Sequence, residues 1–199
     1  MNDSTAVKTL CILRLSALGD ATHVLPLIRT LQRNLPGCRI TWILGKAEAK
    51  LMEGLENVEL IAFDKKSGLK GVKQLAQQLA GKRFDVLLQM QLALRANLIS
   101  AVIPAKRRIG YNTGRSKEGH GLFINERIAS GKHHVLDVFG LFAEPLGFSQ
   151  TEVRWDIPVS PDEHAWAKAQ WPDGRPVLLI SPCSSHVLRN WMPERYAAV

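Results

Sequence analysis

Short apolar runs alternate with amphipathic stretches over residues 9–111, and this alternation constrains the fold more than any other feature of the chain. The apolar runs predict strands at Thr9–Leu15, Arg39–Leu44, Val58–Phe63, Val86–Gln89 and Arg107–Tyr111. Stretches with helical spacing follow them at Ala21–Asn34, Lys46–Leu55, Leu69–Ala80 and Leu92–Val102. Strands separated by helices build βαβ units around a mostly parallel sheet. The sequence therefore predicts an α/β, Rossmann-like fold.

The pattern changes after Asn112. Residues 113–132 are rich in Gly, Lys and Arg and have little periodicity, so we expect a long surface loop with a short strand near Leu122–Ile124. Two further helices are predicted, at His134–Leu146 with Gly147 as its C-cap and at Pro161–Gln170.

A new strand and helix near the end of the chain predict a second domain. Val177–Ser181 has the composition of a buried strand, and a helix begins at Pro193. We therefore expect one domain over residues 1–170, and a linker with the truncated start of a second Rossmann-like domain over residues 171–199. By this interpretation the chain is a fragment of a longer protein.

The charge balance favours an anionic partner. Lys and Arg number 26 against 18 Asp and Glu, a formal net charge of +8, which suits nucleic acid, an anionic lipid surface or a phosphorylated sugar. The five Trp residues lack the spacing of base-stacking positions, which weakens the nucleic-acid alternative.

No part of the chain has the features of a membrane span, a signal peptide or a disulfide framework. No apolar run approaches the roughly 20 residues that cross a bilayer, and the N-terminus is polar. The three Cys residues have neither disulfide nor zinc spacing. We therefore expect a cytoplasmic protein with reduced thiols.

The loop after the first strand is the first candidate site, because ligands of open parallel sheets bind outside the carboxyl ends of the strands. This loop ends at Gly19 and Asp20 and contains no glycine-rich nucleotide motif. From the residues alone, Asp20 is foremost a structural helix N-cap. The alternative is a general base, since a helix start favours a negative charge and a carboxylate there can accept a hydroxyl proton.

The loop after the predicted strand Val177–Ser181 is the second candidate. Ser184 and Ser185, with the backbone N–H groups of the turn, can hold a phosphate that Arg189 neutralises. An ordinary turn explains the small polar residues equally well. Cys183 lies in the same loop, but no His and acid pair marks it as a nucleophile.

A basic run is the third candidate. It places five cations within twelve residues, namely Lys106, Arg107, Arg108, Arg115 and Lys117. Runs of this kind are usually solvated surface. No spacing suggests a metal site, and we expect no metal ion or cofactor.

Four segments, in order and spacing, resemble the bacterial heptosyltransferases of glycosyltransferase family 9. They are RLSALGDATHVLPLIRTLQRNLP (14–36), RRIGYN (107–112), HHVLDVFGLFAEPLG (133–147) and LLISPCSSHVLRNWMPERYAAV (178–199). The resemblance covers essentially the whole chain, and the Gly-Asp pair after the first strand is its strongest element. That family has two Rossmann-like domains facing a cleft, the GT-B fold. It transfers heptose from ADP-L-glycero-D-manno-heptose to the inner core of lipopolysaccharide, with inversion at the anomeric carbon.

The resemblance implies a role for each candidate. Asp20 becomes the general base, in an acceptor-side domain over residues 1–170. Arg108, Arg115 and Lys117 become contacts for the carboxylates and phosphates of a Kdo-lipid A or heptosylated acceptor at the inner leaflet of the membrane, to which the enzyme is peripherally bound.

On the donor side, the resemblance implies that Ser184, Ser185 and Arg189 face the ADP phosphates. The sequence departs from the family there, because Arg189 replaces a common Lys and Trp191-Met192-Pro193 replaces Trp-Pro. It implies no metal, and we expect residues 1–199 alone to be inactive because most of the donor side is missing. The alternatives are a family 9 transferase with another sugar or acceptor, and a non-catalytic module that binds anions or nucleic acid.

Overall fold

The computed structural model describes residues 7–131, 134–149, 153–171, 174–182, 184 and 186–198. Two compact units make up the chain, Met1–Val159 and Ser160–Val199. The first unit carries the sheet. The second carries short helices and extended segments.

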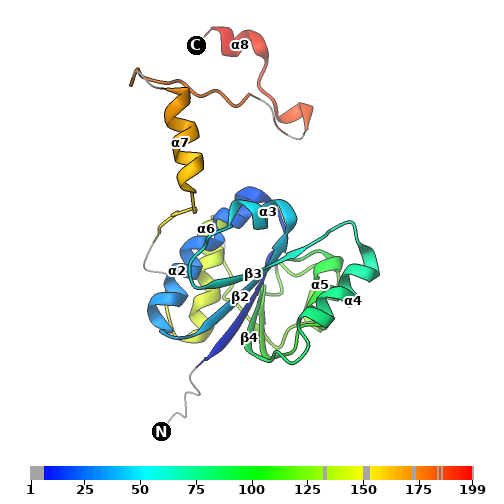
Figure 1. Ribbon diagram of the computed structural model, residues 1–199. Coiled ribbons are helices and arrows are strands. Elements are labelled where there is room, and N and C mark those ends of the chain that lie inside the picture. Colours follow the sequence, from blue (N-terminus) through cyan, green and yellow to red (C-terminus); the bar gives the residue numbers. More distant parts are fainter. Residues whose placement is uncertain are drawn as a thin grey trace. The chain divides into compact units, whose positions relative to one another are not determined.

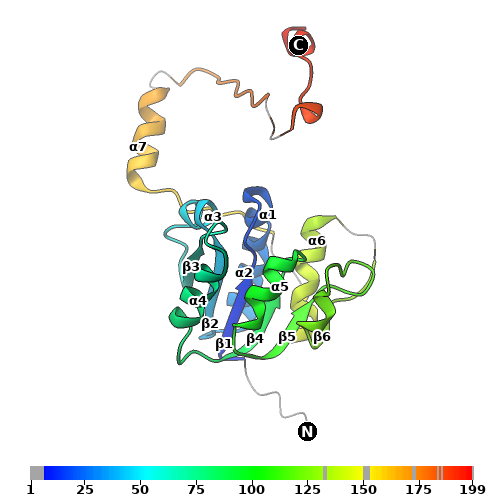
Figure 2. The ribbon, with the colours of Figure 1, turned by 90° about the vertical axis from the view of Figure 1, so that its right-hand side faces the viewer.

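The first unit is built on a six-stranded parallel sheet of order β3-β2-β1-β4-β5-β6, seen across its width in Figure 2. Its strands are β1 (Thr9–Leu13), β2 (Arg39–Gly45), β3 (Val58–Phe63), β4 (Phe84–Gln89), β5 (Ala105–Gly110) and β6 (Glu126–Arg127). The predicted Rossmann-like α/β fold is confirmed. Because β1 lies between β2 and β4, the loop that follows β1 lies where the strand order reverses, the usual ligand position in such sheets.

Helices cover both faces of this sheet. They are α1 (Leu18–Thr22), α2 (Val24–Asn34), α3 (Lys46–Leu51), α4 (Gly68–Gln78), α5 (Leu94–Ala101) and α6 (Val135–Gly140), with the 3₁₀ helices η1 (His120–Leu122) and η2 (Leu141–Leu146). Figure 1 shows α2 and α6 on one side of the sheet, and α4 and α5 on the other. For α4 and α5 the predicted boundaries differ from those observed by one or two residues at each end.

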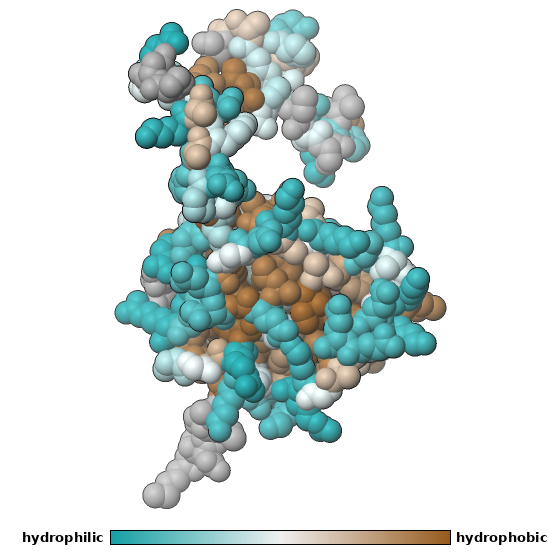
Figure 3. Space-filling model, in the orientation of Figure 1, coloured by the Kyte–Doolittle hydropathy of each residue, from teal (hydrophilic) through white to brown (hydrophobic). Residues whose placement is uncertain are grey.

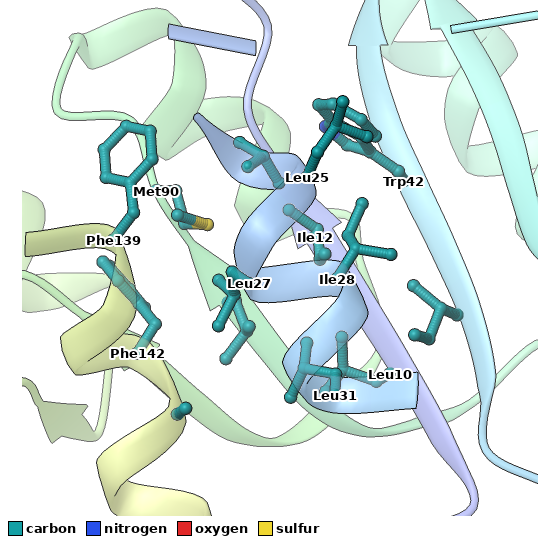
Figure 4. Close-up of a cluster of buried hydrophobic side chains, with 14 of the residues drawn as sticks. Leu10, Ile12, Leu25, Leu27, Ile28, Leu31, Trp42, Met90, Phe139 and Phe142 are labelled. Carbon is teal, nitrogen blue, oxygen red and sulfur yellow. The ribbon is translucent and has the colours of Figure 1, made fainter. Parts of the chain in front are cut away.

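Side chains of β1 alternate between two apolar cores, which is why the strand reads as an unbroken apolar run. Leu10 and Ile12 belong to the core under α2 and α6, and Cys11 and Leu13 belong to the core under α4 and α5. Figure 4 shows the α2 side of the first core, in which side chains of α2 meet those of the sheet and of the α6–η2 segment. Each buried Leu or Ile there stabilises the fold by roughly 1.5–3 kcal/mol.

The predicted helix Ala21–Asn34 is wrong as a single helix. The structure has α1 and α2 instead, separated at His23. Pro26 is the reason, because a proline ring clashes with the carbonyl four residues earlier, here that of Thr22, and supplies no N–H to bond it.

Two other predicted elements differ between β5 and the end of η2. The short strand near Leu122–Ile124 is wrong, since Leu122 ends η1 and the strand lies at Glu126–Arg127. The helix His134–Leu146 begins as α6 but continues as the 3₁₀ helix η2, which contains Pro145. Gly147 is confirmed as the C-cap, with a φ of +88° that favours glycine.

The second unit has three short helices among its described residues, α7 (Pro161–Gln170), η3 (Val187–Arg189) and α8 (Pro193–Ala197). The predicted helix Pro161–Gln170 is confirmed as α7. It opens with a capping box, in which Ser160 Oγ accepts from the Glu163 N–H at 3.2 Å and the Glu163 carboxylate accepts from the Ser160 N–H at 2.7 Å.

The predicted buried strand Val177–Ser181 is wrong for this structure. The segment is extended but unpaired, and Leu178 and Leu179 are 83% and 85% exposed. The described part of this unit contains no strand to pair with it. The predicted domain boundary after residue 170 stays a prediction.

On the face of the first unit drawn in Figure 3, long polar side chains lie around and over a central area of apolar residues. Among the described residues, no helix combines the length and the apolar character that crossing a membrane requires.

Candidate functional site

Asp20 lies in α1, directly after the loop that follows β1. The prediction of Asp20 as an N-cap is wrong, because Ala17 occupies the N-cap and Asp20 is the third residue of the helix. Its side chain still serves the helix start, since Oδ2 accepts from the Ala17 N–H at 3.1 Å. Oδ2 also accepts from Arg14 at 2.5 Å, and the side chain is 36% exposed. Within the described part of the chain nothing donates to Oδ1, so this oxygen is available to a ligand.

Arg14 is the residue that fixes this carboxylate. Its side chain is 13% exposed, and its guanidinium lies 5.2 Å from the centre of the Phe139 ring, in cation–π range. Nη1 donates to the Met90 carbonyl at 2.5 Å, just beyond the end of β4. Arg14 therefore joins Asp20 to the carboxyl end of the neighbouring strand.

Tyr111 also contacts the Met90 carbonyl, to which its hydroxyl donates at 3.2 Å. Burial raises the pKa of Tyr111 to about 12, and the charges of Arg14, Asp20 and Arg115 also act on its hydroxyl.

Contacts to both neighbouring strands hold the loop between β1 and α1. The Gln91 side chain accepts from the Leu15 N–H at 2.7 Å and donates to Ser16 Oγ at 3.1 Å. On the β2 side, the Gly45 N–H donates to the Leu15 carbonyl at 3.1 Å. A Cβ on Gly45 would lie 2.6 Å from that carbonyl oxygen, so the close approach requires glycine.

Arg115 and Lys117 lie in the loop after β5, at the same edge of the sheet as Asp20. The backbone N–H of Arg115 donates to the Asn112 carbonyl at 3.1 Å. Neither cationic group makes a hydrogen bond or ion pair to any described residue, and Lys117 is exposed. Both remain available for an anionic ligand.

A buried polar network fixes this loop on α5 and β4. His120, fully buried, accepts the Tyr111 N–H at Nε2 (3.1 Å), so its proton resides on Nδ1 and is donated to Asn97 Oδ1 at 3.0 Å. Gln89 donates to the same Asn97 oxygen at 2.6 Å, and Asn97 Nδ2 donates to the Glu118 carbonyl at 3.0 Å. The backbone that presents Arg115 and Lys117 is therefore anchored at both ends.

Arg108 has a different position. Its guanidinium donates to the carbonyls of Phe123 (2.7 Å), Ile103 (2.9 Å) and Ser100. Burial lowers its pKa from the ordinary value. These bonds close the C-terminal end of α5 and occupy three of its nitrogens, so Arg108 has a structural role and we do not carry it into the acceptor site.

In the second unit, Ser184 precedes η3 and Arg189 is the last residue of η3. The Ser184 N–H donates to Asn190 Oδ1 at 2.7 Å and its hydroxyl donates to the His186 carbonyl at 2.9 Å. Arg189 ends η3 and is exposed. Ser185 and Cys183 lie outside the described residues.

Sequence reasoning missed Arg14 and Tyr111 as members of the site. A signal for Arg14 was present, because it is the single charged residue in the apolar run Thr9–Leu15 and buried charges require partners. Nothing in the sequence marks the Met90 carbonyl on which the two converge. Among the described residues, no group of three or more His, Cys, Asp or Glu side chains is arranged to hold a metal ion.

Comparisons with known proteins agree on one family. Residues 72–199 match the family described as glycosyltransferase family 9 (heptosyltransferase). The chain is 46% identical over 195 residues to the lipopolysaccharide core heptosyltransferase OpsX of Haemophilus influenzae, covering 98% of this chain and 56% of that protein. It is 24% identical over 163 residues to lipopolysaccharide heptosyltransferase 1 of Escherichia coli K12, covering 75% of this chain and 51% of that protein. The chain thus spans about half the length of the curated relatives it matches.

Solved structures share the fold. A family 9 glycosyltransferase from Veillonella parvula matches 96% of this chain and 57% of its own, with a TM-score of 0.80 and 20% identity. The E. coli heptosyltransferase WaaC, solved with ADP, matches 74% of this chain and 50% of its own, with a TM-score of 0.64 and 21% identity. At these identities the likeness supports the fold alone.

Proposed function

Because the chain belongs to glycosyltransferase family 9, we propose that it forms the acceptor-side part of a heptosyltransferase of the lipopolysaccharide core. The donor is ADP-L-glycero-D-manno-heptose, and the acceptor is a Kdo or heptose hydroxyl of the inner core. One observation carries the catalytic assignment. Asp20 lies at the carboxyl edge of the central strand, with Oδ2 held by Arg14 and Ala17 and with Oδ1 available to a ligand.

The transfer inverts the anomeric carbon in one displacement. The acceptor oxygen attacks that carbon from the face opposite the phosphate, and a new C–O bond forms as the bond to the β-phosphate oxygen breaks. The electron pair leaves with ADP, and the hydroxyl proton passes to Asp20 Oδ1. A positioned general base of this kind contributes roughly 10²- to 10⁴-fold in rate.

Cationic residues bind the charged groups of both substrates. Arg115 and Lys117 contact carboxylates and phosphates of the acceptor, at the same sheet edge as Asp20. In the second unit, Ser184, Ser185 and Arg189 contact the ADP diphosphate. Backbone N–H groups and a guanidinium can neutralise the charge of the diphosphate without a metal ion. The formal net charge of +8 suits peripheral binding at an anionic inner-leaflet surface.

Steady-state kinetics on the full-length product of the gene test this assignment. Release of ADP is measured with ADP-heptose and a Kdo-terminated or heptose-terminated acceptor. Asp20→Asn should lower kcat by roughly 10²-fold or more, because the amide cannot take the proton.

Asp156→Asn is the matched control. Asp156 pairs with Arg29 at 2.8 Å, and the side chains of that pair are 39% and 10% exposed, close to those of Asp20 and Arg14. This variant should keep the wild-type rate. Unchanged turnover in Asp20→Asn overturns the general base, and transfer from a different sugar nucleotide overturns the donor assignment.

A further inference from the structure

We propose that Arg14 is the positioning residue of this site and sets the rate of transfer through the Asp20 carboxylate. The inference rests on the proposed function, because it assigns a role to a neighbour of the proposed general base. Arg14 does not touch substrate in this scheme. It holds one oxygen of Asp20 so that the other faces the acceptor hydroxyl.

Three contacts from different parts of the fold immobilise the guanidinium. Nη1 is bound to the Met90 carbonyl after β4, the ring of Phe139 in α6 lies 5.2 Å from the guanidinium carbon, and Nη2 is bound to Asp20. Arg14 itself continues from β1, with its N–H donating to the Ile43 carbonyl at 3.1 Å. The carboxylate is thus tied to the sheet as well as to the five-residue helix α1.

The division of bonds between the two carboxylate oxygens gives this arrangement its chemical meaning. Both bonds to Asp20 fall on Oδ2, from Arg14 and from the Ala17 N–H. Rotating the carboxylate group out of its plane would break both bonds. The Arg14 contact therefore fixes the plane of the carboxylate and leaves the oxygen without a donor, Oδ1, as the proton acceptor.

Stability alone does not explain an arginine at this position. Arg14 Nε is buried and has no hydrogen-bond partner among the described residues, and an unsatisfied buried donor lowers stability. Apolar residues of similar volume often replace buried ion pairs without loss of stability. The role that explains the arginine is positional, because its other two nitrogens bind the Met90 carbonyl and the Asp20 carboxylate.

The test compares variants of the full-length protein in the ADP-release assay. Arg14→Ala should lower kcat about 100-fold, because a displacement of about 1 Å in a reacting group has an effect of that size, and KM for ADP-heptose should stay unchanged. Guanidinium ion at sub-denaturing concentration should restore part of the lost rate. Arg14→Lys should have a kcat below that of the wild type, since a single ammonium group cannot bind the Met90 carbonyl and Asp20 with two separate nitrogens as a guanidinium does. Arg14→Met, which keeps the apolar packing over Phe139, should lose as much rate as Arg14→Ala while melting near the wild-type temperature.

Arg29→Ala is the matched control. It removes an Arg–Asp pair of similar exposure, and it should keep the wild-type kcat and show no response to guanidinium. In an Asp20→Asn background, Arg14→Ala should cause no further loss, because Arg14 acts through the carboxylate.

Three results overturn the inference. They are a wild-type kcat in Arg14→Met, the same fractional loss with and without the Asp20 carboxylate, and a loss that guanidinium does not relieve. The proposed function fails separately, through full activity in Asp20→Asn itself. Where the Asp20→Asn rate is too low to measure, the guanidinium response of Arg14→Ala decides.

Discussion

Tyr111 and Arg14 donate to the same backbone oxygen, the carbonyl of Met90, at 3.2 and 2.5 Å. The carbonyl belongs to the residue that follows β4 and comes from neither residue's own strand, so three adjacent strand ends meet at one acceptor. This carbonyl is the centre of the candidate site, and the loss of either hydrogen bond to it has measurable consequences.

Replacing Tyr111 by Phe should change the alkaline stability of the first unit. Burial raises the pKa of Tyr111 to about 12, above the value near 10 of an unfolded tyrosine. The folded state therefore holds the phenol proton more tightly. This contribution to stability is complete below pH 10 and is lost as the pH rises from about 10 to 12.

Urea unfolding at several pH values measures this effect. The wild-type free energy of unfolding should fall more steeply than that of Tyr111→Phe between about pH 10 and 12. At neutral pH the variant should be less stable by about 1 kcal/mol, for one lost hydrogen bond. Parallel alkaline curves for the two proteins would contradict the raised pKa.

Replacing His120 should change the acid stability. Burial lowers the pKa of His120 from its ordinary value, which is about 6.5, so the folded state favours the neutral ring. As the pH falls below about 6.5, His120 binds a proton in the unfolded chain but stays neutral in the folded chain, so the free energy of unfolding decreases.

His120→Ala should remove this part of the acid dependence. It should also destabilise the protein at pH 8 by about 1–3 kcal/mol, because the Tyr111 N–H loses its acceptor and the Asn97 oxygen loses one of its two donors. Denaturant midpoints from about pH 8 to 5 measure both effects. If stability still falls with pH as steeply in the variant as in the wild type, a group other than His120 causes the acid dependence.

Gly45→Ala should destabilise the connection between β2 and the loop of the candidate site. Its Cβ would lie 2.6 Å from the backbone oxygen of Leu15, which has no freedom to move aside. We expect a loss of about 1–3 kcal/mol, typical of overpacking. Gly19→Ala is the control, because nothing lies within 4 Å of its Cβ, and it should be neutral or slightly stabilising since alanine favours a helix. Equal midpoints for the two variants in urea would contradict the close approach.

Arg115 and Lys117 should affect acceptor binding, whereas Arg108 should affect stability. Alanine at either of the first two should raise KM for the acceptor about tenfold, or about 1.4 kcal/mol, with little change in kcat and with a smaller effect at high salt. Arg108→Ala should instead lower the melting temperature, because three carbonyls lose a charged donor. A wild-type acceptor KM in both loop variants would remove them from the site.

Periodicity was sufficient to predict strands β1 to β5 of the first unit and the positions of α4 and α5, because each element buries a face whose spacing is visible in the sequence. It did not predict β6, which lies at Glu126–Arg127 rather than near Leu122–Ile124. It failed at Pro26, where the steric effect of one ring outweighs a continuous apolar face. It failed again at Val177–Ser181, where composition indicated a strand but no partner strand lies among the described residues. For the candidate site, the Gly-Asp pair after a strand was sufficient to single out Asp20 as a candidate, and its role as general base stays a proposal. The contact of Arg14 with Met90 joins residues 76 apart in sequence, and no local pattern records it.

That separation also bears on how the protein folds. Two contacts of the site close loops of 76 residues, namely Arg14 with Met90 and Leu15 with Gln91. Closing such a loop lowers the entropy of the chain before the contacts it brings together can stabilise the fold. Helices α2 and α4 need only local bonds to start, whereas the candidate site exists only after β1 has paired with β4. A spectroscopic probe near Asp20 should therefore report the completion of the sheet, later than far-ultraviolet circular dichroism reports the helices.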